Sequence, residues 1–168
     1  ISITDVKCGA NHTVALDTQG HVYTWGFGGY GRLGHAEQKD EYFPRSVEMF
    51  EREYSWALFI AAGGSCTLAV TEEYQLYFWG RIKSSGEANM YPKVVPDLDG
   101  WQINAVSAGY KHIVVLSGNK VIAWGASPCF GQLGHGRVSE LLHRHNRPCG
   151  GSLQRASSQR LGCSAPSS

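Results

Sequence analysis

The sequence lacks long apolar runs, clustered metal ligands and an excess of either charge. No stretch approaches the roughly 18 consecutive apolar residues that a membrane-spanning helix requires. Lys plus Arg number 15 against 14 for Asp plus Glu, so the composition provides no strongly basic surface for nucleic acid. The cysteines are odd in number and scattered, which argues against a disulfide framework and favours a reducing, intracellular compartment: Cys8, Cys66, Cys129, Cys149 and Cys163.

Signatures of catalytic or metal sites are also missing. The last part of the chain contains the densest group of potential ligands: His143, His145, Cys149 and Cys163. None of them has the C-x2-C type of spacing that zinc sites use. Ser65 and Ser107 lie near glycine but outside a G-x-S-x-G nucleophile elbow. We therefore expect no catalytic residues, no metal, no cofactor and no small-molecule substrate.

One glycine pattern resembles a nucleotide-phosphate motif. Gly26, Gly28 and Gly31 spell G-x-G-x-x-G. A phosphate site of this kind needs a helix directly after the motif, so that the helix N-terminus can hold the phosphate. The residues after Gly31 show no apolar helical periodicity, and the matching segment 125–134 lacks the motif. We interpret these glycines as turn residues.

The charge is unevenly distributed along the chain. Residues 1–136 contain 10 Lys plus Arg and 13 Asp plus Glu, a net charge of −3, whereas residues 137–168 contain 5 Arg and one acid, a net charge of +4. The second segment is rich in Ser, Arg and Gly and has no strand periodicity. We expect it to be a low-complexity, disordered tail.

The main positive signal is an internal repeat. Glycine reaches 21 of 168 residues, which indicates many tight turns. Gly9, Gly63 and Gly109 recur in step with Trp25, Trp79 and Trp124. A third column holds His12, Cys66 and His112. Residues that recur once per repeat favour a structural role.

The sequence pattern of each repeat predicts two short strands joined by a hairpin turn. Their β-branched and aromatic residues alternate with period two, and the second strand ends at the Trp-Gly pair. The predicted strands are 13–16, 22–25, 68–70, 76–79, 113–116 and 121–124. Helix is plausible only at 46–50 or 141–145.

Repeats of about 45 to 54 residues with paired strands and a fixed aromatic predict β-propeller blades. The fold class is therefore all-β: a partial propeller of about two and a half blades with a disordered tail. We divide residues 1–136 into a part repeat 1–19, repeats 20–72 and 73–117, and a part repeat 118–136, followed by the tail 137–168.

The segments "CGANHTVAL…VYTWGFGGYGRLGH" and "SAGYKHIVVL…VIAWGASPCFGQLGHG" resemble the repeats of the regulator of chromosome condensation family. The resemblance covers about residues 1–136 and implies a seven-bladed propeller. It also implies binding of a small Ras-superfamily GTPase, promotion of guanine-nucleotide exchange, and a location in the nucleus, on chromosomes or the spindle, and in the cytoplasm. A different reading is an adaptor for chromatin or microtubule-associated proteins that has no exchange activity, because fold does not fix function.

No short motif marks the residues that would contact a partner. Loops carried on a rigid scaffold are the best candidates, and we expect partner contacts at Phe27–Arg32, Lys39–Arg45 and Ser127–Gln132. We also expect the apolar faces of the first and last blades to be partly open to water, at Leu16, Val22, Val115 and Ile122. The chain alone should then be marginally stable and inactive in nucleotide exchange.

Overall fold

The computed structural model describes residues 1–82, 87–126 and 130–134. Within these ranges the chain forms strands, three short 3₁₀ helices and no α-helix. The strands are β1 (Ile3–Cys8), β2 (His12–Asp17), β3 (Val22–Gly26), β4 (Glu41–Ser46), β5 (Ala57–Ala62), β6 (Cys66–Thr71), β7 (Leu76–Gly80), β8 (Asn89–Val94), β9 (Ile103–Ala108), β10 (His112–Ser117) and β11 (Lys120–Gly125). The 3₁₀ helices are η1 (Gly29–Gly31), η2 (Glu48–Glu51) and η3 (Pro96–Leu98).

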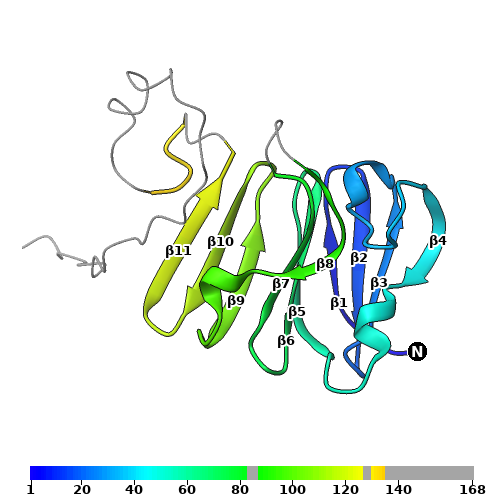
Figure 1. The fold of residues 1–168 in the computed structure, drawn as a ribbon, viewed down its shortest axis with the longest axis horizontal. Coiled ribbons are helices and arrows are strands. Elements are labelled where there is room, and N and C mark those ends of the chain that lie inside the picture. Colours follow the sequence, from blue (N-terminus) through cyan, green and yellow to red (C-terminus); the bar gives the residue numbers. More distant parts are fainter. Residues whose placement is uncertain (83–86, 127–129, 135–168) are drawn as a thin grey trace, which may run out of the picture.

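The strands form three separate antiparallel meanders that lie side by side as propeller blades (Figure 1). Blade one is β1-β2-β3-β4, blade two is β5-β6-β7-β8, and blade three is β9-β10-β11 within the described residues. Within each blade every strand pairs with the next one in sequence. Most of the connections are short turns, but β3 is joined to β4 by residues 27–40. The predicted all-β, partial-propeller fold is confirmed.

The six strands predicted from sequence are present, and each is one to three residues longer than expected. The prediction missed the first strand of each blade and the outer strands β4 and β8. Both outer strands contain proline, Pro44 and Pro92, which is tolerated because an edge strand leaves one side unpaired. The helix considered at 46–50 is the short 3₁₀ helix η2, and 141–145 lies outside the described residues.

The core consists of two layers on either side of blade two. One layer packs Val14, Leu16 and Val22 of blade one against Ile60 and Trp79 of blade two. The other packs the opposite face of blade two against blade three, through Leu68, Val70, Leu76, Ile113 and Val115. Blade two therefore buries both of its faces, and at about 25 cal/mol per Å² of apolar surface these layers hold the three blades together.

The residues expected to be open to water are buried, so that prediction was wrong in its choice of side chains. Leu16, Val22, Val115 and Ile122 are at most 8% exposed, because all four point toward blade two. In blade three the outward face is carried by their neighbours, Leu116 at 37% and Val121 at 51% exposure. Alternation places adjacent residues on opposite faces, but it does not say which face meets a neighbouring blade.

The three repeated tryptophans are not equally buried. Trp79 is fully buried in the layer between blades one and two, whereas Trp25 and Trp124 are half-buried. The ring of Trp79 faces blade one. Trp25 holds the same position in blade one, and no blade precedes blade one within the described residues.

The glycine-rich segment after the first Trp-Gly pair crosses to blade two. Gly34, at φ +80°, lies against Trp79: a Cβ there would be 2.9 Å from the indole Nε1. Ala36 N donates to Met90 O of β8 at 2.9 Å. This segment therefore covers the buried tryptophan of the next blade, which only a residue without a side chain permits at Gly34.

Candidate functional site

The loop predicted at Phe27–Arg32 lies at the end of the blades where β1 turns into β2. Phe27 and Tyr30 are exposed at 45% and 39%. Tyr30 has a positive φ of 62° inside η1, a backbone conformation that is typical of tight turns. Arg81 of blade two places its guanidinium carbon 3.5 Å from the centre of the Tyr30 ring. This end of the molecule therefore presents aromatic rings beside a positive charge.

Arg32, in the same loop, is not available to a partner. It is 2% exposed, and its guanidinium donates to Gly29 O at 2.8 Å, Gly64 O at 2.9 Å and Ser65 Oγ at 3.3 Å. Gly64 and Ser65 belong to the β5–β6 turn, so Arg32 connects blade one to blade two. Gly64 N in turn donates to Tyr110 O of blade three at 3.2 Å.

A buried series of hydrogen bonds extends from Arg32 through Thr67 to His12, between blades one and two. Thr67 Oγ1 donates to Arg32 O at 2.7 Å, so its hydroxyl proton is used and His12 Nε2–H donates to Thr67 Oγ1 at 2.9 Å. His12 Nδ1 is buried and has no partner among the described residues. Burial, followed by the charge of Arg32, lowers the pKa of His12 to about 4. His12 is thus a neutral structural donor.

The matching positions between blades two and three carry a different chemistry. Cys66 stands where His12 stands, and Ile113 where Thr67 stands; both are buried in the apolar layer. Burial raises the pKa of the Cys66 thiol to about 12, so it is a neutral packing residue and not a nucleophile or thiolate ligand. The replacement of histidine by cysteine therefore goes together with the loss of its hydroxyl partner.

The other two predicted loops are placed differently. Lys39–Arg45 is mostly strand, since β4 begins at Glu41 and pairs Arg45 with Thr24 of β3; the expectation of a loop was wrong there, because β4 completes the blade. Its exposed rings, Tyr42 and Phe43, lie at the outer edge. Of Ser127–Gln132, residues 127–129 lie outside the described residues, and Phe130 is 94% exposed.

The last three residues of the G-x-G-x-x-G pattern form the 3₁₀ helix η1 (Gly29–Gly31). Gly28 N donates to Asp40 Oδ1 at 2.8 Å, a carboxylate of the same loop. No α-helix follows the motif in the described part of the chain, so the helix N-terminus that a phosphate would need is missing there.

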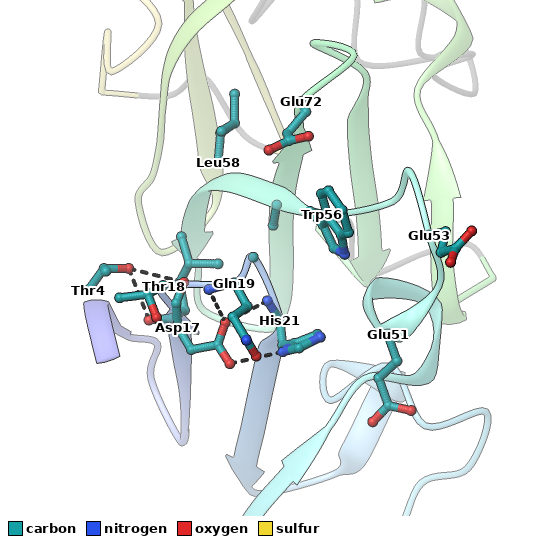
Figure 2. Close-up of a pocket in the computed structure, with 13 residues that line it drawn as sticks. Thr4, Asp17, Thr18, Gln19, His21, Glu51, Glu53, Trp56, Leu58 and Glu72 are labelled. Atoms are coloured by element: carbon teal, nitrogen blue, oxygen red, sulfur yellow. Dashed lines mark hydrogen bonds and ion pairs between the residues drawn. The ribbon is translucent and has the colours of Figure 1, made fainter. Parts of the chain in front are cut away.

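A groove of about 710 Å³ opens at the opposite end of the blades, where the β2–β3 turn of blade one meets the linker into blade two. Sequence reasoning did not identify it. Figure 2 shows the indole of Trp56 in this groove with Glu53 and Glu72 on either side of it in that view. Trp56 is 37% exposed. Among the described residues that line the groove there is no Lys or Arg.

Asp17 supplies the wall of the groove from the β2–β3 turn. Its carboxylate accepts hydrogen bonds from Gln19 N at 2.8 Å, His21 N at 2.9 Å and Tyr23 OH at 3.2 Å, and lies 3.0 Å from His21 Nδ1. Burial alone raises the pKa of Asp17, but the His21 and Gln19 donors outweigh it and lower the pKa below its usual value. Asp17 is therefore a charged, fully partnered residue that fixes the turn.

The described residues contain no group of three or more His, Cys, Asp or Glu side chains placed to hold a metal ion. The ligand candidates at His143, His145, Cys149 and Cys163 lie outside the described residues. No helix in the described part of the chain is long and apolar enough to span a membrane.

Comparison with known proteins assigns the repeats. Models of the regulator of chromosome condensation (RCC1) repeat match residues 3–32 and 19–70. Protein RCC2 from Mus musculus and from Homo sapiens is 52% identical over 136 residues, which is 81% of this chain. The ultraviolet-B receptor UVR8 from Arabidopsis thaliana is 30% identical over 86% of the chain. The chain spans 26% of the length of either RCC2 and 34% of UVR8.

The fold agrees with that of two solved structures. Prp20p from Saccharomyces cerevisiae, described together with its binding to Gsp1p and histones, superposes with a TM-score of 0.70 at 25% identity, covering 86% of this chain and 36% of Prp20p. Human WBSCR16 superposes with a TM-score of 0.64 over 73% of this chain and 33% of its own. The chain therefore contains regulator of chromosome condensation (RCC1) repeats, is similar in sequence to Protein RCC2 and forms part of a β-propeller.

Proposed function

We propose that these blades belong to a propeller that binds a small GTPase and promotes release of its guanine nucleotide. Such a regulator needs no general acid or base. It needs a surface that binds the nucleotide-free GTPase more tightly than the loaded one, and the nucleotide is then released by mass action. The family resemblance motivates this proposal, and Prp20p, which binds Gsp1p and histones, is a structural relative.

The observation that carries the proposal is the aromatic and basic surface at the loop end. Phe27, Tyr30 and Tyr110 are exposed at 45%, 39% and 70%, and Arg81 lies against Tyr30. Tyr, Trp and Arg are the residue types that contribute most to protein interfaces. Arg32 ties the turns that carry this surface to one another, which provides the rigid support that partner-binding loops require.

The test is release of a fluorescent guanine nucleotide from a panel of purified small GTPases, catalysed by a protein in which these blades complete a ring. Tyr110→Ala should weaken binding to the nucleotide-free GTPase by about tenfold, as expected for a central aromatic contact. Tyr91→Ala, 53% exposed on the edge strand β8, is the matched control and should not change binding. No acceleration with any GTPase would refute the exchange function.

The second candidate is an adaptor that binds chromatin or microtubule-associated proteins without exchange. It is favoured by the similarity to UVR8, a protein named as a receptor, since a chain of similar sequence has another purpose there. The two candidates differ in one measurement: an adaptor would bind its partner but leave the nucleotide-release rate unchanged. For either candidate, we propose a location in the nucleus, on chromosomes or the spindle, and in the cytoplasm.

A further inference from the structure

The groove around Trp56 has the composition of a cation-binding site. An indole ring is the best aromatic acceptor for a Lys or Arg side chain, and Trp56 is exposed enough to offer its ring to such a group. Glu53 and Glu72 are exposed carboxylates that line the same groove. Asp17 is already saturated by its own turn, and Glu51 accepts a hydrogen bond from Ser46. Glu53 and Glu72 are thus the carboxylates best placed to pair with an incoming cation.

The peptide between Trp56 and Ala57 is held from two sides, so the backbone that carries the ring is preorganised. Ala57 N donates to Gly20 O of blade one at 2.9 Å, and Glu72 N of blade two donates to Trp56 O at 3.0 Å. A Cβ at Gly20 would lie 2.5 Å from Trp56 Cβ, so the turn packs directly on this residue. A ligand that binds here does not have to order the linker first, which lowers the entropic cost of binding.

The same chain already places a cation on the tryptophan of its next linker. Trp101 lies in the linker before β9, as Trp56 lies in the linker before β5, and Lys120 Nζ is 4.9 Å from the Trp101 ring centre. Lys120 is contributed by the β10–β11 hairpin. At the corresponding hairpin of blade two the residue next to Trp56 is Glu72, a carboxylate. No cation of the described residues lies over Trp56; Arg52, four residues away, is paired with Glu48 at 3.1 Å.

We propose that this groove binds a basic peptide segment of a partner protein, with one Lys or Arg side chain on the Trp56 ring and neighbouring charges paired with Glu53 and Glu72. A volume of about 710 Å³ accommodates several residues of an extended segment. The groove is at the end of the blades opposite to the loops proposed to bind a GTPase: β1 pairs Ile3 with Asp17 at the groove end and Cys8 with Thr13 at the loop end. The inference is independent of the proposed function.

The test is fluorescence anisotropy of a labelled nine-residue peptide of alternating Arg and Gly, titrated with the full 168-residue chain. The same peptide with Gln in place of Arg is the ligand control. Binding of the Arg peptide should weaken as salt rises, because exposed ion pairs are screened. Trp56→Leu should weaken it about tenfold, and Glu72→Gln several-fold.

Two variants separate this site from general charge attraction. Tyr54→Leu removes an aromatic ring that is 77% exposed in the same linker but does not line the groove, and Glu73→Gln removes a carboxylate of the same turn outside it. Both should bind the peptide as the unmodified chain does. The inference is overturned if these controls lose as much affinity as Trp56→Leu and Glu72→Gln, or if the Gln peptide binds equally well.

A second measurement keeps the test decisive if Trp56→Leu folds poorly. With 5-fluorotryptophan in the chain, the Trp56 resonance can be assigned from Trp56→Phe, which preserves a ring. Addition of the Arg peptide should shift this resonance and leave the buried Trp79 resonance unchanged. An unchanged Trp56 signal at peptide concentrations that saturate the anisotropy would also overturn the inference.

Discussion

At the level of single residues, His12 shows how burial fixes a protonation state. Its Nε2–H donates to Thr67, while Nδ1 is enclosed without an acceptor among the described residues, so a second proton there would be unpartnered beside the charge of Arg32. The folded state therefore holds His12 with a pKa of about 4, below the 6.5 of an unfolded chain.

The sign of the resulting pH dependence follows from linkage. Between pH 6.5 and 4 the unfolded chain binds a proton at His12 that the folded chain does not bind. The contribution of His12 to the free energy of unfolding is therefore complete above pH 6.5 and is lost as the pH falls from 6.5 toward 4. The full difference corresponds to about 3 kcal/mol. Urea unfolding between pH 4.5 and 7.5 should show this slope, and His12→Gln should flatten it. A slope in His12→Gln equal to that of the unmodified chain would contradict the assignment.

Trp79 and Trp124 provide a second test at this scale. Trp79→Ala should lower the free energy of unfolding by roughly 3 to 5 kcal/mol, the usual cost of emptying a buried tryptophan site. Trp124→Ala should cost less, because its side chain is only half-buried where it packs against the layer between blades two and three. Denaturant titration of both variants measures the difference. Equal costs would show that Trp79 does not fill the space between blades one and two.

At the level of elements, the segment from Gly28 to Gly34 joins two blades instead of merely connecting two strands. It carries Arg32 onto the β5–β6 turn and Gly34 onto Trp79. After the Trp-Gly pair of blade two, the sequence Arg81–Gly86 replaces the Gly-rich sequence. The contact between blades one and two is therefore partly polar, whereas that between blades two and three is apolar at the matching positions.

A substitution at Gly34 tests the covering role of this segment. Gly34→Ala combines the strain of an Ala at φ +80° with a contact of 2.9 Å to Trp79 Nε1. Gly100→Ala has a similar φ of +75° but nothing within 4 Å, so it measures the strain alone. We expect Gly34→Ala to destabilise the chain by about 2 kcal/mol more than Gly100→Ala, because only the methyl group at position 34 overpacks a neighbouring side chain. Thermal unfolding of the two variants compares them directly, and equal losses would argue against the contact.

At the level of the whole molecule, the outward face of blade three determines how the 168-residue chain behaves in solution. Leu116 and Val121 are cross-strand partners, exposed at 37% and 51%, and form an apolar face that matches the one blade two buries. Propeller blades normally bury such faces on the next blade. The chain alone should therefore self-associate and fail to accelerate nucleotide release.

Sedimentation velocity over a range of concentrations measures this association. Val121→Lys should shift the chain toward monomer, because a charge cannot be buried unpaired in the contact. Val94→Lys, which changes a 39% exposed valine on the edge strand β8, should not. A concentration-independent monomer with a cooperative unfolding transition, together with accelerated nucleotide release, would contradict this expectation.

The sequence by itself determined what is local and repeated. Period-two alternation located β2, β3, β6, β7, β10 and β11, and the matched columns of Gly, His and Trp established the propeller, because each residue's preference agrees with its neighbours along the strand. The predicted partition into repeats, the partner-contacting loops and the predicted disorder of residues 137–168 remain predictions.

Only the tertiary structure decided which faces and which residues meet between blades. Alternation could not tell that Val115 is buried while Leu116 is exposed, since that depends on the side from which the neighbouring blade packs. The hydrogen bonds from Arg32 to Gly64 O and from Ala57 N to Gly20 O are contacts across blades. Such contacts bring together residues tens of positions apart that leave no mark in either segment alone, because each segment satisfies its own strand pairing without them.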